Sequence, residues 1–235
     1  MANTPLSRDR EYSIFFIGNS YTYFNSMPEL FRQIAAECGY DVKVDSVTKG
    51  GYKLYLYADP ADEYGSKVEA KFNENKYDYV FLQEQSVYPC TETKKFNDGV
   101  SALARRAREA GATPLLYQTW GRHAGHSTLA ENDWDTFMRE GILRSSYKTA
   151  AEHIDAKVAY VGAAFAEVYR EHPEIELYDP DLTHPSKNGS ILAATVLFST
   201  LFGVSPSDIP DDVFEDCDCF TILKQAAEKI VNTVA

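Results

Sequence analysis

The sequence predicts an α/β fold, a three-layer α/β/α sandwich built on a five-stranded parallel sheet. Five short apolar stretches alternate with segments of helical periodicity, which is the pattern of consecutive strand–helix–strand units. The first stretch contains four consecutive large apolar residues, Ile14 to Ile17, and stops at a Gly-Asn-Ser turn signal. A run without polar alternation is typical of a parallel strand buried on both faces.

The first strand is expected over residues 12–17, and the later strands follow from apolar stretches bounded by turn residues. Residues 42–47 alternate as an edge strand does and run into Lys49-Gly50-Gly51. The segment 77–82 ends in Gln83-Glu84-Gln85-Ser86. Residues 113–119 are accepted as a strand because Pro114 lies near the first position, where it disturbs pairing least. The fifth strand is expected over residues 157–162.

The segments between these strands carry helix signals. Pro28 and Glu29 lie where the first turn of a helix favours them, and apolar residues then recur at helical spacing until Gly39. Further helices are expected over residues 62–75, 96–110, 134–154, 163–171, 186–202 and 221–234. Helices and strands in this sequence order predict the flavodoxin-like strand order 2-1-3-4-5.

Composition narrows the classes of partner. The 235 residues contain 44% hydrophobic residues and no Pro/Ser/Gly-rich linker, so we expect a single domain over residues 1–235. A net charge of −12 disfavours nucleic acid and anionic membrane as partners, because both require a basic surface. No apolar run approaches the ~18 residues that a membrane span needs.

Cysteine usage favours a reducing compartment. The four cysteines form no C-x-x-C pair, and Cys217 and Cys219 are too close in sequence for an ordinary structural disulfide. Residues 1–11 lack the apolar core of a signal peptide. We therefore expect a cytoplasmic location, with secretion open if a signal peptide has been removed. The sequence carries no indication of oligomeric state.

Ser20 follows the first strand directly. Open parallel sheets bind ligands beyond the carboxyl ends of their strands, so a hydroxyl at this point is a candidate nucleophile. The alternative is a plain strand-to-helix turn, because Gly, Asn and Ser are ordinary turn residues.

A second polar group lies near the far end of the chain, in Asp181-Leu182-Thr183-His184. Asp and His three residues apart on a loop can both face one pocket. The carboxylate then orients the imidazole, which takes a proton from a hydroxyl nucleophile. The alternative is a turn that leads into the next helix, because Ser186 is a good N-cap residue.

Together these blocks resemble the SGNH (GDSL-like) hydrolase superfamily. Gly18-Asn19-Ser20 matches the family's first block, whose serine is the nucleophile, and Asp181 with His184 matches the last block, the acid and base of the triad. Gly50 or Gly51 matches the second block, whose glycine N–H serves the oxyanion hole together with that of the serine. The resemblance spans most of the chain and implies an α/β/α sandwich.

The sequence departs from the family pattern at two places. The first block commonly reads Gly-Asp-Ser, and Asn19 stands here in place of the acid, a change outside the triad that we expect to be tolerated. The third block, usually Gly-x-Asn-Asp, is replaced by Gln83-Glu84-Gln85-Ser86. Ungapped placement puts Gln85 at the asparagine, so its carboxamide would complete the oxyanion hole. Gln83 through a shifted register, or backbone donors alone, are the alternatives.

The resemblance implies a serine esterase that removes acetyl or another short acyl group from a carbohydrate or small ester. Acyl transfer needs a nucleophile, a base with its orienting acid, and oxyanion donors, and all are expected at strand ends. The same superfamily includes thioesterases and acyltransferases. A non-catalytic carbohydrate-binding domain on the same fold is a further alternative. No Gly-x-Ser-x-Gly elbow, Gly-x-Gly-x-x-Gly or P-loop occurs, so neither an α/β-hydrolase nor nucleotide binding is supported.

Four residues near the expected site are candidate substrate contacts: Tyr21, Gln83, His123 and His126. The two histidines could instead pair around a metal, but no acids or cysteines stand nearby at ligand spacing, so we expect no metal and no cofactor. The expected partner is a small-molecule or carbohydrate ester.

Overall fold

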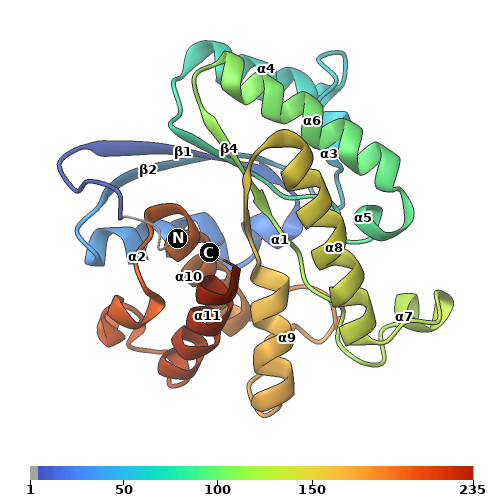
Figure 1. Ribbon diagram of the computed structural model, residues 1–235, viewed down its shortest axis with the longest axis vertical. Coiled ribbons are helices and arrows are strands. Elements are labelled where there is room, and N and C mark those ends of the chain that lie inside the picture. The colour runs from blue at the N-terminus through green and yellow to red at the C-terminus, as the bar shows by residue number, and fades with distance from the viewer. Residues whose placement is uncertain (1–4, 235) are drawn as a thin grey trace.

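The computed structural model of the protein describes residues 5–234 (Figure 1). At its centre lies a sheet of five parallel strands in the order β2-β1-β3-β4-β5, which confirms the predicted fold class and strand order. The strands are β1 (Glu11–Gly18), β2 (Asp41–Thr48), β3 (Tyr79–Leu82), β4 (Thr113–Tyr117) and β5 (Lys157–Ala159).

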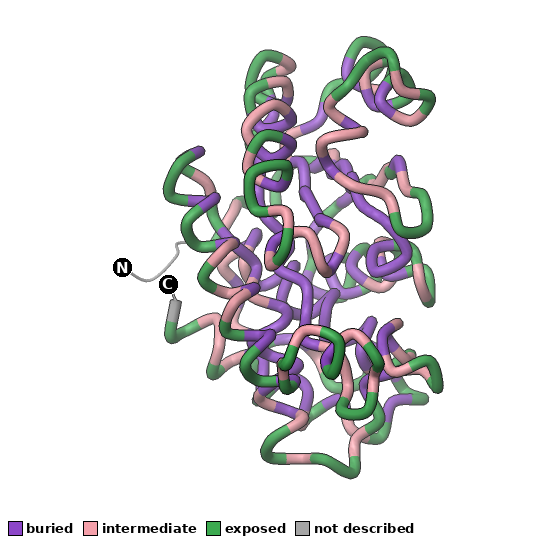
Figure 2. The backbone as a smooth tube through the Cα atoms, turned by 90° about the vertical axis from the view of Figure 1, so that its right-hand side faces the viewer, coloured by how far each residue is buried: buried purple, intermediate pink, exposed green. Residues whose placement is uncertain are grey.

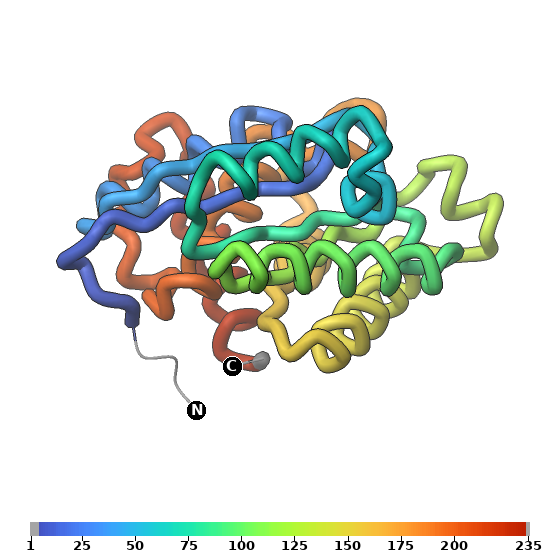
Figure 3. The backbone as a smooth tube through the Cα atoms, turned by 90° about the horizontal axis from the view of Figure 1, so that it is seen from above, coloured from blue at the N-terminus to red at the C-terminus, as the bar shows by residue number. Residues whose placement is uncertain are grey.

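Helices cover both faces of this sheet. One face carries α2 (Met27–Glu37), α9 (Val161–Glu171), α10 (Lys187–Phe202) and α11 (Phe220–Val234). The other carries α3 (Leu54–Tyr57), α4 (Glu63–Glu74), α6 (Thr93–Glu109) and α8 (Thr136–Ile154), of which α4 and α6 are nearest the viewer in Figure 3. Short segments complete the chain: α1 (Ser20–Tyr23), α5 (Tyr88–Thr91), α7 (Ser127–Glu131) and 3-10 turns at Phe24–Ser26, Pro206–Asp208 and Asp211–Phe214.

Strand β1 is buried on both faces, as the unbroken apolar run predicts. Ile14 and Phe16 point into the core beneath α2 and α10, whereas Phe15 and Ile17 point into the opposite core. Each of these side chains is at most 1% exposed, and each contributes about 1.5–3 kcal/mol of burial free energy. Figure 2 shows that buried segments lie at the centre of the molecule and that exposed segments lie on its outer helices and loops.

The elements differ from the prediction mainly at their ends. The fifth strand stops at Ala159 instead of residue 162, because Val161 already begins α9. An apolar stretch that passes from strand into helix shows no break in hydrophobicity, so its pattern cannot locate the boundary. The one-turn helices α3, α5 and α7 were not predicted, because four or five residues are too few to display a helical period.

Two glycines within helices provide a test of the packing between α3 and α6. A Cβ on Gly99 of α6 would lie 2.5 Å from the backbone nitrogen of Tyr55, whereas a Cβ on Gly141 of α8 would meet no atom within 4 Å. We expect Gly99→Ala to destabilise the protein by about 1–3 kcal/mol through overpacking. Gly141→Ala should stabilise it by about 0.5–1 kcal/mol, because alanine restricts the unfolded chain. Urea unfolding measures both, and equal stabilisation by the two variants would contradict the described packing.

Candidate active site

Ser20 is the first residue of α1 and follows β1 through a tight turn. Asn19 caps this helix, since its Oδ1 accepts from the backbone N–H of Tyr21 at 3.2 Å. A Cβ on Gly18 would lie 2.4 Å from Thr22 Oγ1 and 2.6 Å from Gln83 Oε1. Only glycine fits there without displacing these groups. The turn therefore presents Ser20 at the carboxyl edge of the sheet.

Gln83 lies behind this turn and does not face the solvent. Its Oε1 accepts from the backbone N–H of Asn19 at 2.8 Å and from Thr22 Oγ1 at 2.9 Å, and its Nε2 donates to the carbonyl of Glu84. The residue is 1% exposed. In this structure the Gln83 carboxamide is enclosed and holds the Ser20 turn, and the expected contact of Gln83 with substrate stays a prediction.

Asn19 has a use that an aspartate could not serve. Its Nδ2 donates to the carbonyl oxygen of Tyr52 at 3.1 Å, in the loop that follows β2 and carries Gly50 and Gly51. The side chain is enclosed, with the residue 2% exposed. The amide therefore links the Ser20 turn to the loop after β2, through a donor that an ionised aspartate would not provide.

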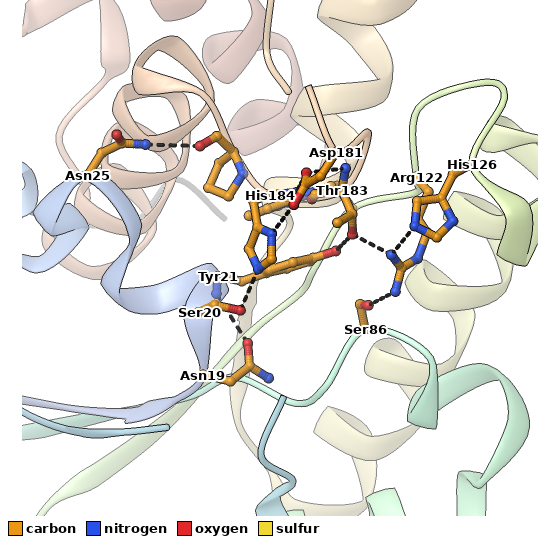
Figure 4. A network of polar contacts seen from close by, with 12 residues as sticks. Asn19, Ser20, Tyr21, Asn25, Ser86, Arg122, His126, Asp181, Thr183 and His184 are labelled. Carbon is orange, nitrogen blue, oxygen red and sulfur yellow. Dashed lines mark hydrogen bonds and ion pairs between the residues drawn. The ribbon is translucent and has the colours of Figure 1, made fainter. Parts of the chain in front are cut away.

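His184 and Asp181 reach Ser20 from a loop 161 or more residues further along the chain (Figure 4). The His184 Nε2 lies 2.8 Å from Ser20 Oγ, and its Nδ1 is bonded to Asp181 Oδ2. Asp181 Oδ1 accepts from the backbone N–H groups of Thr183 and His184 at 3.0 and 2.9 Å. The structure thus brings together the three side chains named from the sequence, in the order that nucleophile, base and orienting acid require.

The pKa of the Asp181 carboxyl is lowered. Partial burial acts to raise it, but the hydrogen bonds from the His184 ring and from two backbone N–H groups outweigh burial. Asp181 is therefore a carboxylate at neutral pH. A carboxylate in this place holds the Nδ1–H tautomer of His184 and leaves Nε2 free to accept the serine proton.

Aromatic side chains fix the histidine ring and its loop. Phe24 stacks on the His184 ring with 4.2 Å between centroids, a contact that the sequence did not reveal. Trp120, fully buried after β4, donates from Nε1 to the carbonyl of Thr183 at 3.0 Å. Leu182 in this loop has a φ of +63°, which is strained for a leucine and is held by the bonds on either side of it.

Tyr21 belongs to the interior. Its ring stacks on Trp120 with 4.4 Å between centroids, its hydroxyl is bonded to Thr183 Oγ1, and the residue is 5% exposed. Both the ring and the hydroxyl of Tyr21 thus have partners within the protein, and the expected contact of Tyr21 with substrate stays a prediction. The physical effect of Tyr21 is to join the helix of Ser20 to the loop of His184.

The candidate oxyanion donors lie on three neighbouring loops. Gly50 and Gly51 are exposed after β2, and Gly51 has a φ of +67°, a conformation that favours glycine. Gln85 follows β3, and its Oε1 accepts from the backbone N–H of Val87 at 2.8 Å. This bond leaves its Nε2 without an acceptor among residues 5–234. Nε2 is thus available to a ligand.

Glu84 joins two of these loops through a buried carboxyl group. Its Oε1 accepts from the backbone N–H of Gln85 at 2.6 Å, and both oxygens lie 3.2 Å from the N–H of Leu54. Burial raises the pKa of Glu84 to about 8, although the N–H groups of Gln85 and Leu54 act in the opposite direction. No sequence signal marked this residue beyond its place between two glutamines.

The histidines of the loop after β4 lie beside the site. His126 Nε2 is 2.7 Å from Arg122 Nη1, and its Nδ1 faces the N–H of Thr128 at the start of α7. The His123 ring packs against Tyr169 and Tyr178. Among residues 5–234 no group of three or more His, Cys, Asp or Glu is placed to hold a metal ion. In the same part of the chain no helix is long and apolar enough to span a membrane.

Comparison with solved structures identifies the family. A protein from Slackia heliotrinireducens described as an SGNH hydrolase is 30% identical, with a TM-score of 0.72, over 82% of this chain and 100% of that chain. The chain belongs to the SGNH hydrolases. The similarity confirms the family expected from the sequence blocks.

Solved structures of lower sequence identity are also similar in fold. A DUF4886 family protein from Bacteroides uniformis has a TM-score of 0.80 at 18% identity, over 95% of this chain and 94% of that chain. The acetyl xylan esterase AlAXEase has a TM-score of 0.59 at 16% identity, over 80% of this chain and 99% of that chain. At these identities the likeness concerns the fold. No family model and no curated protein sequence matches the chain.

The role of the Asn19 amide can be tested by converting it to the acid common in other SGNH hydrolases. Asn19→Asp places a carboxylate oxygen where Nδ2 now donates to Tyr52. Two buried acceptors would then face each other, so we expect a loss of about 1–3 kcal/mol in unfolding free energy at pH 8. The loss should be smaller at pH 5, where a protonated carboxyl can donate. Urea unfolding at both pH values checks this, and an unchanged stability at pH 8 would contradict it.

The buried Glu84 should make stability depend on pH. A glutamate pKa of 4.5 in the unfolded chain and about 8 in the folded protein means that folding retains a proton between these values. The contribution of Glu84 to stability is then fully present below pH 4.5 and falls by up to about 1.4 kcal/mol per pH unit as pH rises towards 8. Glu84→Gln cannot titrate, so its stability relative to the wild type should improve steadily from pH 5 to pH 8. Urea unfolding at several pH values measures this. If the difference in unfolding free energy between the two proteins stayed constant from pH 5 to pH 8, Glu84 would already be ionised in the folded protein at pH 5.

Proposed function

We propose that this SGNH hydrolase is a serine esterase that removes acetyl or another short acyl group from a carbohydrate or small-molecule ester. The observation that carries the proposal is the continuous hydrogen-bonded chain from Ser20 through His184 to Asp181. A hydroxyl, an imidazole and a carboxylate in this order can activate the hydroxyl without a cofactor.

In the first half of the reaction, Ser20 Oγ attacks the ester carbonyl carbon while His184 Nε2 takes the serine proton. The carbonyl oxygen becomes an oxyanion, which the N–H groups of Ser20 and of Gly50 or Gly51 and the Nε2 of Gln85 stabilise. His184 then protonates the departing alcohol oxygen, and the carbon–oxygen bond breaks to leave an acyl group on Ser20.

In the second half, His184 takes a proton from water, whose oxygen attacks the acyl carbon. The tetrahedral intermediate collapses, and the proton on His184 passes to Ser20 Oγ as the acid leaves. Asp181 holds the ring in place and stabilises the imidazolium in both halves. A thiol ester, or an alcohol in place of water, would use the same groups, so thioesterase and acyltransferase activities share this site.

The fold and its neighbours support an esterase over the alternative, a carbohydrate-binding domain without turnover. A binding domain has no requirement for a histidine within 2.8 Å of a serine hydroxyl. The solved structures of similar fold include an acetyl xylan esterase, which supports acetyl as the acyl group and a carbohydrate as the alcohol.

Ser20→Ala tests the proposal. We expect the variant to lose hydrolysis of 4-nitrophenyl acetate by about a thousandfold or more, because Ser20 carries the one hydroxyl among residues 5–234 that is bonded to His184 Nε2. A fluorophosphonate probe should modify the wild type at Ser20, and labelling should also be lost in His184→Ala. Ser66→Ala, which removes an exposed serine of α4, is the control. Activity of folded Ser20→Ala within tenfold of the wild type, or absence of labelling in the wild type, would overturn the esterase.

A further inference from the structure

Two arginines flank Ser86, the residue that follows the candidate oxyanion donor Gln85. Arg122 comes from the loop after β4, and its Nη2 donates to Ser86 Oγ at 3.3 Å. Arg139 comes from α8, and its Nη2 donates to the Ser86 carbonyl. Figure 4 shows the Arg122 guanidinium on the side of the site opposite Asn25, close to Ser86 and Thr183.

Neither guanidinium has a carboxylate partner within residues 5–234. This is unusual for their surroundings, because Arg139 is completely buried, Arg122 is half-buried, and the chain as a whole carries a net charge of −12. Buried charges in proteins are normally paired, since an unpaired one loses its hydration without compensation. The neighbouring Cys90 does not balance them, because burial raises the pKa of its thiol although Arg139 opposes the rise.

The two arginines also have more donors than residues 5–234 have nitrogen or oxygen acceptors for them. Arg122 Nε, Arg139 Nε and Arg139 Nη1 are buried without such an acceptor, and Arg139 has only the Cys90 thiol, a weak acceptor, as a further partner. His126 faces donors at both ring nitrogens, Arg122 Nη1 and the Thr128 N–H. A neutral imidazole has one acceptor nitrogen, so it satisfies only one of the two. Buried donors without acceptors are few in native proteins, so three of them on two neighbouring arginines mark this place as unusual.

The Arg122 guanidinium adjoins the candidate catalytic groups on three loops. Its Nη1 donates to Thr183 Oγ1 at 2.6 Å, and Thr183 lies between Asp181 and His184 in the sequence. The same hydroxyl is bonded to Tyr21, the residue after Ser20. A group held by Arg122 would therefore lie beside an ester bound at Ser20.

We propose that Arg122, with the charge of Arg139 behind it, binds a carboxylate of the substrate, so that the protein acts on esters of acidic molecules. This rests on the proposed esterase function and specifies its substrate class. A guanidinium suits a planar carboxylate because its N–H groups can bond both oxygens, and it keeps its charge at every physiological pH. A carboxylate at the accessible part of Arg122 would supply the negative charge that no residue among 5–234 supplies to these two arginines.

Two matched pairs of esters test this proposal. In the first pair the carboxylate is on the acyl side, 4-nitrophenyl hydrogen succinate against 4-nitrophenyl butyrate. In the second it is on the alcohol side, 4-acetoxybenzoate against its methyl ester. We expect kcat/KM of the wild type at low ionic strength to favour the anionic ester in one pair by about tenfold or more. Added salt should reduce this preference.

The variants assign the preference to a residue. Arg122→Gln should lower the ratio of kcat/KM for the anionic ester to kcat/KM for the neutral ester by about tenfold or more. Arg122→Lys keeps the positive charge but loses the paired N–H donors of the guanidinium, so it should lower this ratio less. Arg105→Gln removes the same charge from the exposed face of α6 and should leave the ratio unchanged. The salt dependence of the wild-type ratio tests the proposal even if Arg122→Gln does not fold.

Two results would overturn the proposal while leaving the esterase intact. One is turnover of the neutral esters with no preference for the anionic member of either pair. The other is a preference that survives Arg122→Gln, which would give Arg122 a purely structural role between the Ser86 and Thr183 loops. Retained activity in Ser20→Ala would instead overturn the esterase, so the two failures are distinguishable.

Discussion

The hydrogen bonds of one buried carboxamide, that of Gln83, hold the turn on which Ser20 lies. Gln83 follows β3 and Asn19 follows β1, so the bond from the Asn19 N–H joins the carboxyl ends of two neighbouring strands. Gly18 has no side chain because Gln83 and Thr22 occupy the space that one would need. The carboxamide is enclosed, and an acceptor lost there would leave a buried N–H unpaired, which is costly. Everything else at this edge of the sheet is arranged around a serine that this bond positions.

The loop of His184 depends on a different kind of contact. Trp120 stacks between Tyr21 and Phe165, and its Nε1 holds the Thr183 carbonyl. Because Tyr21 is on the helix of Ser20, one aromatic stack sets the distance between the nucleophile and the histidine loop. Such stacks are rigid because large rings bury much surface and lose little conformational freedom. The histidine loop can therefore maintain the strained φ of Leu182 without disturbing the Ser20–His184 contact.

Charge is distributed unevenly around this edge. The chain is acidic overall, yet Ser86 is bonded to two guanidiniums. Beside these arginines lie the Cys90 thiol, whose pKa is raised by burial, and His126, whose pKa is lowered by burial and by the two arginines. On the other side, Glu84 is a buried carboxyl group whose pKa is raised to about 8. A carboxylate ligand at Arg122 would thus meet positive charge. Glu84, in the loop after β3, is mostly protonated at neutral pH and would add little opposing negative charge.

The sequence by itself determined the fold class, the strand order and the family. These follow from local and repeated signals: an unbroken apolar run such as Ile14 to Ile17, the alternation of strands and helices, and short blocks at strand ends. Ser20, Asp181 and His184 were recognisable for the same reason, because each stands in a compact motif. The end of β5 was not, because hydrophobicity does not change where the strand passes into α9, and the one-turn helices were not, because they are too short to display a helical period.

Only the tertiary structure decided which polar side chains near Ser20 are enclosed and which have a donor left for a ligand. Gln83, Gln85 and Glu84 are neighbours in the sequence, yet one holds the Ser20 turn, one has a free amide, and one bridges two loops. Tyr21 and Gln83 were expected at the substrate and are buried, and Arg122 and Arg139 carried no sequence signal at all. The physical reason is that burial and hydrogen-bond partners come from residues tens to more than a hundred positions away, so a polar side chain's surroundings cannot be deduced from its own neighbours in the chain.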